Sequence, residues 1–570
     1  MNKLFGKILI SKFGWVYLLI VLFAINFLAS VFHSRIDLTK EKRYTLTKAT
    51  KNIIRNLDDV LYIDVFLAGE FPAGFRKLAN STEDFLDLLK DENGSKVRYR
   101  FISPQETMEG TEISYEDSLV KMGASPINLT VQVKAGQESR RVYPVALVRY
   151  NGRQSLVNIY SGGKRMISAV EMNSAEAMME YQFARSIDAL TNPQKPLIAY
   201  SSGNGEVVDA RTYDLQQTLD KDYELFLLDI NKQPFIPDTF RALIIVKPTL
   251  QFSDDEKLKI DQYVMRGGKL LLFVDALIAE QDSLRIKPET VAFDRNLNLT
   301  DMLFRYGVRI NPSLVMDLQC DFMPFVVGGS QENPQYEFLH WNYYPLFEPK
   351  ANHTITRNLG LVAGRFVNSM DTIQTPGIQK TVLLSSSSNS RVISTPALIS
   401  LNENRNAPED EKFRQSDIPV AVLLEGKFNS LYRNHISSVK ADSLNAMGVP
   451  FMPASTGEGK MIIVADGDMV LNDLSSEGPL PMGLNFFTVG SQYEYQFANR
   501  DFLLNSLEYM ISNPAISETR NKNIVLRLLD MTKVDEQRTT WQFINIVVPV
   551  LLVIISGWIY QQVRKRKYAS

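Results

Sequence analysis

Two uninterrupted apolar runs stand near the ends of the chain. Residues 13–32 read FGWVYLLIVLFAINFLASVF and residues 541–560 read WQFINIVVPVLLVIISGWIY, and neither run contains a charged side chain. At about 1.5 Å per residue, a helix of this length spans the roughly 30 Å hydrocarbon core of a bilayer. The pattern predicts two transmembrane helices. A cleaved signal peptide is the alternative for the first run, and a buried core helix for the second.

The short tails outside the runs predict how such helices are oriented. Residues 1–12 contain three lysines and no acid, and residues 561–570 contain four basic side chains and no acid. Because Lys and Arg favour the cytoplasmic side, both tails are expected there, with the main body on the opposite side. Asn26, Gln542 and Asn545 are polar positions within the runs. Such groups join membrane helices, so we expect them to contact a neighbouring helix.

The first block of the main body, residues 40–190, mixes two patterns. Apolar segments at 60–69 and 96–104 flank a helical stretch, which is the spacing of a parallel strand-helix-strand unit. Turn residues then interrupt alternating segments at Ala135-Gly136 and Asn151-Gly152, as in antiparallel hairpins. The block is therefore predicted to be an α+β domain.

Pro193 and Pro196 mark a boundary, after which strands and helices alternate through residues 193–312. This alternation predicts a doubly wound α/β sheet. Residues 313–455 are rich in Pro, Ser, Asn and aromatics, and we expect an irregular, β-rich region of unassigned fold. A strand at 459–468 and a helix at 499–511, both within 456–515, are expected to return to the α/β domain, and 516–540 form a membrane-proximal segment.

Composition narrows the possible partners and chemistry. Lys and Arg number 62 against 64 Asp and Glu, and removing the seven basic tail residues leaves a formal charge of −9 between the tails. An acidic body is a poor match for nucleic acid, so a protein partner is favoured. The single cysteine, Cys320, excludes an intramolecular disulfide and a multi-cysteine zinc site, and it is expected to be a buried thiol. The four histidines lack the spacing of a metal site.

Motifs for phosphate binding are incomplete. No segment has the glycine and lysine spacing of a Walker A loop, and SGNGE at 202–206 follows a strand but lacks the third glycine of a dinucleotide fingerprint. Open α/β sheets nevertheless place ligands at the carboxyl ends of their strands. The loop residues Gly203, Asn204, Gly205 and Glu206 are therefore candidates for contact with a ligand or partner.

Acidic side chains end two of the expected strands, Asp275 after one and Asp466 and Asp468 after another. Acids at such positions suit catalysis or cation binding, but more often cap loops. We therefore expect no catalytic residue, no cofactor and no metal.

The segment QYEFLHWNYYPLFEP, residues 335–349, is unusually dense in aromatics. These side chains either pin a loop to the body or form a contact surface for a protein or glycan. Trp341, Tyr343 and Tyr344 are the candidates for such a surface.

Several segments together resemble the gliding-motility-associated ABC transporter auxiliary protein family, GldG. They are KEKRYTLTKAT after the first run, the block ending in FISP, AYSSGNGE, FSDDEKLKIDQYVMRGGKLLLFVD, PVAVLLEGKFNSLY, MIIVADGDMVLND, and the closing run with its basic tail. The resemblance covers nearly the whole chain. It implies a bacterial inner-membrane subunit with a periplasmic body, working with a separate permease and ATPase. It also implies an α/β domain similar to a class I glutamine amidotransferase that has lost its activity, and LLLFVDAL here carries Asp275 without a nucleophilic cysteine.

The hypothesis from the sequence is a non-enzymatic, membrane-anchored extracytoplasmic subunit, and oligomerisation stays open. A first alternative is an independent ligand- or glycan-binding protein with a cleft between the α/β domain and the 313–455 region. A second is a degenerate hydrolase that depends on Asp275, Asp466 or Asp468.

Overall fold

The computed structural model describes most of the chain between residues 45 and 568. The described residues are 45–511 with gaps at 70, 72, 108–113, 123, 125, 134–135, 161–168, 193, 282–283, 285–286, 331–332, 351–352 and 402–409, together with 519–520, 531–568 and positions 16, 19–23, 26 and 37. Residues 1–523 form one compact unit and residues 524–570 a second.

The N-terminal part of the first unit is built on a four-stranded sheet of order β2-β1-β5-β6. Its strands are β1 (Leu61–Val65), β2 (Val97–Phe101), β5 (Val145–Tyr150) and β6 (Arg153–Asn158), with β1 and β2 parallel and the other pairs antiparallel. The helices α3 (Lys48–Arg55), α4 (Ala73–Glu92) and α6 (Ala169–Thr191) share one apolar core with this sheet, and α5 (Tyr115–Lys121) packs in a second. Both predicted hairpins are confirmed, since β5 pairs with β6 and β3 (Ile127–Val133) with β4 (Gly136–Val142).

A ten-stranded sheet organises the rest of the first unit, in the order β15-β16-β19-β22-β23-β10-β9-β7-β8, with β17 (Val362–Ala363) beside β16. The parallel strands are β7 (Leu197–Ser202), β8 (Glu224–Asp229), β9 (Ala242–Val246), β10 (Lys269–Phe273) and β23 (Gly459–Val464). Residues of β9 and β10 are almost all buried, as expected for central parallel strands covered on both faces.

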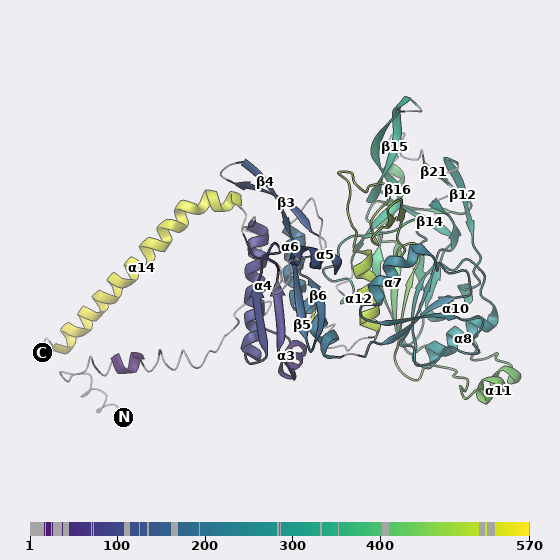
Figure 1. Ribbon diagram of the computed structural model, residues 1–570, viewed down its shortest axis with the longest axis horizontal. Coiled ribbons are helices and arrows are strands. Elements are labelled where there is room, and N and C mark those ends of the chain that lie inside the picture. The colour runs from purple at the N-terminus through teal and green to yellow at the C-terminus, as the bar shows by residue number, and fades with distance from the viewer. Residues whose placement is uncertain are drawn as a thin grey trace. The chain divides into compact units, whose positions relative to one another are not determined.

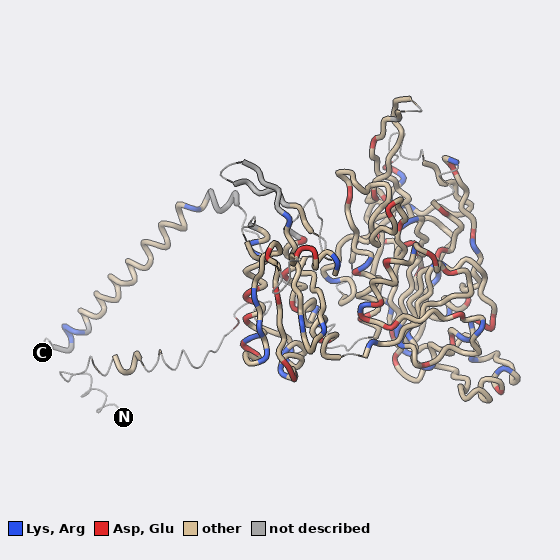
Figure 2. The backbone as a smooth tube through the Cα atoms, in the orientation of Figure 1, with Lys and Arg blue, Asp and Glu red and all other residues tan. Residues whose placement is uncertain are grey.

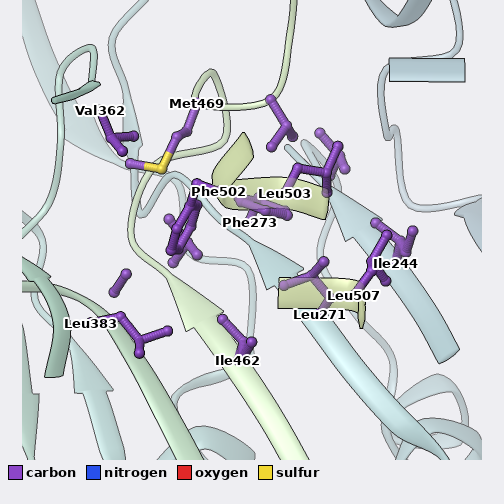
Figure 3. Packing of buried hydrophobic residues seen from close by; sticks show 14 of the residues in the cluster. Ile244, Leu271, Phe273, Val362, Leu383, Ile462, Met469, Phe502, Leu503 and Leu507 are labelled. Atoms are coloured by element: carbon purple, nitrogen blue, oxygen red, sulfur yellow. The ribbon is translucent and has the colours of Figure 1, made fainter. Parts of the chain in front are cut away.

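Helices cover both faces of the parallel strands, which confirms the doubly wound sheet (Figure 1). The helices α7 (Tyr213–Leu219) and α12 (Asn499–Ile511) share one core with it, while α8 (Asp254–Met265) and α10 (Thr300–Tyr306) share the other. Figure 3 shows Phe502, Leu503 and Leu507 of α12 packed among side chains of β9, β10 and β23. Ser253 forms a capping box with Glu256 at the start of α8.

The region 313–455, whose fold could not be assigned from sequence, continues the same sheet. The strand β22 (Pro419–Gly426) pairs antiparallel with β23, and β19 (Ile378–Ser385), β16 (Asn333–Pro349) and β15 (Cys320–Ser330) follow outward, each antiparallel to the strand before it.

Smaller elements complete the first unit. They are β11 (Leu277–Ile278), β12 (Glu289–Asp294) and β21 (Ala397–Ser400) in one sheet; the pairs β13 (Val308–Ile310) with β18 (Met370–Thr372), β14 (Ser313–Asp317) with β20 (Ser390–Ser394), and β24 (Leu474–Ser475) with β25 (Gly478–Pro479); and the helices η1 (Ala210–Thr212), η2 (Asp410–Lys412) and α11 (Ser438–Ala446).

The second unit contains the long helix α14 (Met531–Tyr568). Its segment Gln537–Arg566 is the one candidate for a membrane span, judged by length and composition, among the described residues. Figure 2 shows a stretch without Lys, Arg, Asp or Glu between basic positions of this helix. The first predicted span, residues 13–32, lies mostly outside the described residues.

Candidate functional site

Three neighbouring parallel strands bring charged residues to one edge of the large sheet. Lys247 directly follows β9, Asp275 follows β10 by two residues, and Asp466 and Asp468 follow β23. Because β9 pairs with β10 and β10 with β23, all three carboxyl ends lie side by side. Glu280 also reaches Lys247, and we call these five residues the charge cluster.

Lys247 lies at the centre of the charge cluster. Its ammonium group is 2.7 Å from both carboxylate oxygens of Asp468, 3.0 Å from Glu280 Oε2 and 3.3 Å from Asp275 Oδ2. The lysine side chain is only 3% exposed, so water contributes little to its solvation. Three carboxylates therefore replace the water that a surface ammonium group would have.

Backbone amides hold the two buried aspartates in place. Asp275 accepts a hydrogen bond from the amide of Gly467, and Asp466 accepts from the amides of Asp468 at 2.8 Å and Arg365 at 2.9 Å. A Cβ atom on Gly467 would lie 2.7 Å from Lys247 Cβ, so only glycine permits this close approach.

Burial and mutual repulsion decide the protonation of the cluster. Burial raises the pKa of Asp275 to about 6, against the opposing attraction of Lys247. Burial, followed by repulsion from Asp275 and Asp468, raises the pKa of Asp466 well above its usual range. Burial alone would lower the pKa of Lys247, but attraction by Asp468, Asp275 and Glu280 raises it. Lys247 therefore stays charged.

The charge cluster contains its own cation. Carboxylate oxygens of Asp275, Asp466 and Asp468 lie within 4.8 Å of one another, a spacing that suits metal ligands. The ammonium group of Lys247, however, already supplies the positive charge next to them. The cluster thus clamps three strand ends together, with its lysine in the role that a cation would take.

A small cavity lies beside the cluster, at the meeting of the α/β domain with the 313–455 region. Asp468 lines it from one side, and Asp321, Tyr344 and Arg365 from the other. Its free volume is about 20 Å³. That is room for a single water molecule, whereas sites for small organic ligands occupy roughly 300–1,000 Å³.

The candidate loop 203–206 turns its side chains inward. Glu206 accepts hydrogen bonds from Ser201 Oγ and the Asn204 amide, each at 2.7 Å, and Asn204 Nδ2 donates to Glu256 Oε2 at 3.1 Å. Asn204 and Glu206 are buried, while Gly203 and Gly205 adopt positive φ angles. The loop is thus fixed to the start of α8 by its own polar groups.

We expect Gly205→Ala to destabilise the protein by about 2 kcal/mol, because the new Cβ meets Thr249 Oγ1 at 2.1 Å and φ is +74°. Gly448→Ala is a matched control, since φ there is +78° but no atom lies within 4 Å. Urea unfolding of both variants separates the clash from the backbone strain, and equal losses would show that the packing of the loop is unimportant.

The candidate aromatics belong to a buried core and lie in the long strand β16, where a loop was expected. Trp341, Tyr343 and Tyr344 are at most 2% exposed and pack around Phe366. Trp341 Nε1 donates to the Ser400 carbonyl at 3.2 Å, and Tyr343 Oη to the Leu398 carbonyl at 3.1 Å. The structure therefore favours the alternative in which these aromatics pin their segment to the body, and it leaves them no surface for a partner.

The remaining residues considered from the sequence are the polar positions of the two apolar runs and Cys320. Gln542 and Asn545 lie on α14 with exposed side chains, and Asn26 is helical and exposed. Cys320 is buried at the start of β15, where burial raises the pKa of its thiol.

Sequence reasoning identified the three aspartates but missed Lys247 and Glu280. The available signal was a lysine directly after the fully apolar strand ALIIV, at the same sheet edge as Asp275.

Comparisons with known proteins place the chain among transport components. A family described as an ABC-type uncharacterized transport system matches residues 195–506, and a domain of unknown function, DUF7088, matches residues 40–149. An uncharacterized protein of Borreliella burgdorferi is 21% identical over 434 residues, covering 74% of this chain and 78% of that protein.

Two solved structures show a distant likeness to this chain. The mmIFT52 N-terminal domain shares 13% identity at a TM-score of 0.31, covering 56% of this chain and 98% of that domain. The exo-beta-1,4-mannosidase Op5Man5 from Opitutaceae bacterium strain TAV5 shares 10% identity at a TM-score of 0.18, covering 75% of this chain and 51% of the enzyme.

Proposed function

The chain belongs to the family of ABC-type uncharacterized transport systems, as an auxiliary component, and we propose that it is a non-enzymatic, membrane-anchored subunit of a gliding-motility-associated ABC transporter. In this proposal the body lies in the periplasm and associates with a separate permease and ATPase. The family match over residues 195–506, which includes the parallel strands of the large sheet, is the observation that carries it.

The C-terminal helix supports a membrane anchor. Its candidate span ends at Arg566, and the last turns contain Arg564, Lys565 and Arg566. Basic residues at that end favour a cytoplasmic C-terminus. We propose that residues 13–32 form a second span, and that Asn26, Gln542 and Asn545 contact the permease.

The chemistry of the sheet edge supports a role without catalysis. In the charge cluster Lys247 is paired with the carboxylates of Asp275, Glu280 and Asp468, and backbone amides hold Asp275 and Asp466. A degenerate hydrolase that uses Asp275, Asp466 or Asp468 would need at least one of them free to reach substrate. The cavity between the two regions holds about 20 Å³, which argues against capture of a glycan there.

Purification of the tagged full-length protein from native membranes in mild detergent tests the proposal. We expect a permease and an ATPase to co-purify in fixed stoichiometry, as measured by quantitative mass spectrometry. A protein that is reproducibly recovered alone would contradict the proposal and favour independent ligand binding.

A further inference from the structure

The helix α6 lies between two parts of the first unit. Met179, Phe183 and Ile187 are four residues apart, so they share one side of the helix, and they belong to the core of the four-stranded sheet. Tyr181 and Arg185 are also four residues apart, and they contact the α/β domain instead. The helix therefore joins the N-terminal domain to the α/β domain. We call the contacts made by Tyr181 and Arg185 the α6 joint.

Polar groups withdrawn from water hold the α6 joint together. Tyr181 Oη donates a hydrogen bond to Glu508 of α12. Arg185 is paired with Asp222, which precedes β8, and its Nε atom lies 4.0 Å from Glu508. Tyr181 and Glu508 are both buried. Their charges and hydrogen bonds must therefore be balanced within the joint, because water cannot supply the missing partners.

A second arginine enters the α6 joint from the C-terminal side of the chain. Arg520 is only 4% exposed, and its guanidinium group lies over the ring of Tyr181, 4.3 Å from the ring centroid. Its Nε atom is buried without a hydrogen-bond partner among the described residues. A guanidinium group whose hydrogen bonds are incomplete leaves its place at a lower cost than one that is fully bonded.

Arg520 supplies positive charge that the α6 joint needs. The joint contains the carboxyl groups of Glu508, Asp222 and Asp501. Burial raises the pKa of Asp501, and attraction by Arg520 opposes that rise more than any other group does. Removal of Arg520 would leave Arg185 facing three carboxyl groups. An unbalanced charge costs far more in a closed interface than in water, so this loss favours separation of the two domains.

Arg520 also lies where the first unit passes to the membrane helix. Residues 519–520 are the last described residues before α14, and the second compact unit begins at residue 524. The candidate span Gln537–Arg566 is part of that helix. A displacement of α14 that is transmitted along the chain therefore reaches Arg520 before it reaches Tyr181, Arg185 or Glu508.

We propose that Arg520 couples the C-terminal membrane helix to the α6 joint. With Arg520 stacked on Tyr181, the N-terminal domain stays fixed to the α/β domain, and withdrawal of Arg520 from the ring releases it. This inference rests on the proposed function, because the transporter partners supply the movement. It gives a chain without a Walker A motif a route by which ATP hydrolysis in a partner changes the arrangement of its own domains.

Distance measurements by electron paramagnetic resonance on the full-length protein in mild detergent test the inference. The spin labels are attached to Glu83→Cys on α4 and Gln217→Cys on α7, both exposed positions, after replacement of Cys320 by serine. The two labels lie in different domains, so their distance reports on the α6 joint. Arg520→Met should raise the ratio of released to fixed molecules by about 5- to 150-fold, the usual range of coupling between two sites.

Further variants separate this effect from a general loss of structure. Adding Asp501→Asn to Arg520→Met removes one unbalanced charge and should reverse most of the release. Arg520→Lys keeps the charge but loses the planar stacking surface, so it should give an intermediate ratio even if the methionine variant does not fold.

Arg500→Met is the matched control. Arg500 is 2.7 Å from Asp214 within the α/β domain, so its loss should lower stability and leave the distance between the labels unchanged. A wild-type distance in both Arg520 variants overturns the inference, and so does an equal change in Arg500→Met.

The same labels in the assembled complex test the connection to α14. Trapping the co-purified transporter with ATP and vanadate should shift the wild-type distance toward that of Arg520→Met. A flexible Gly/Ser insertion after Asn523 should abolish this response and leave the resting distance unchanged. The inference is wrong if the wild type does not respond, or if the response survives the insertion. If the permease and ATPase do not co-purify, the proposed function fails, whereas the distances in detergent still decide whether Arg520 fixes the joint.

Discussion

Lys247→Met should destabilise the protein by about 3–5 kcal/mol, the typical loss when one partner of a buried ion pair is removed. The substitution takes the ammonium group away from Asp468 and Asp275 and leaves their charges facing one another, while Glu280 keeps its ion pair with Arg295. Methionine has a similar length and no charge, so the loss reports on electrostatics more than on packing. Urea unfolding of the full-length protein in mild detergent, followed by circular dichroism, measures it.

Two further variants make this result specific. Lys440→Met removes an exposed lysine that is 2.6 Å from Asp255, and we expect a loss below about 1 kcal/mol there. Adding Asp468→Asn to Lys247→Met removes one of the unpaired charges and should restore part of the stability. If the double variant is no more stable than Lys247→Met alone, the charges of the cluster do not set the effect.

Local patterns could predict much of the doubly wound part. Buried strands such as ALIIV and the capping box at Ser253 are determined by neighbours in sequence, and the structure contains both. The fold of region 313–455 could not be predicted in this way, because the region joins the large sheet through a long-range strand pairing. The strand β22 pairs with β23, and only that contact shows that the region extends the large sheet.

The charge cluster shows the same limit at the level of single residues. Asp275 and Asp466 were candidates because each follows an expected strand. Their proximity, however, depends on the parallel pairing of β10 with β23. Lys247 joins them because β9 lies on the other side of β10. Spatial strand order cannot be derived from hydrophobic periodicity, so the counter-ion was missed while the acids were found.

The aromatic segment was ambiguous for a different reason. Trp and Tyr are favoured both in protein cores and at contact surfaces, so composition alone could not decide between them. The burial of Trp341 and Tyr343 depends on β14, β20 and β21, whose positions follow from the tertiary fold.

Asp275 should make the protein less stable at neutral pH than at mildly acidic pH. Burial raises its pKa in the folded state to about 6, while the ordinary value is 3.8. Between these values the folded protein holds a proton that the unfolded chain releases, so its contribution to stability is lost as the pH rises from about 4 to 6. At about 1.36 kcal/mol per pKa unit, this single group accounts for about 3 kcal/mol.

The comparison of wild type with Asp275→Asn measures this effect together with the accompanying change at Asp466, whose pKa is raised in part by repulsion from Asp275. The free energy of unfolding, measured by urea titration at pH 4, 5, 6 and 7, should fall more steeply with pH in the wild type than in the variant. Acidic groups with lowered pKa values, such as Asp255 beside Lys440, make the folded protein more stable as the pH rises. They are present in both proteins, so their contribution cancels in the difference between the two free energies of unfolding. Parallel pH profiles would show that the pKa of Asp275 in the folded state is not raised above its ordinary value, and hence that attraction by Lys247 at least balances the effect of burial.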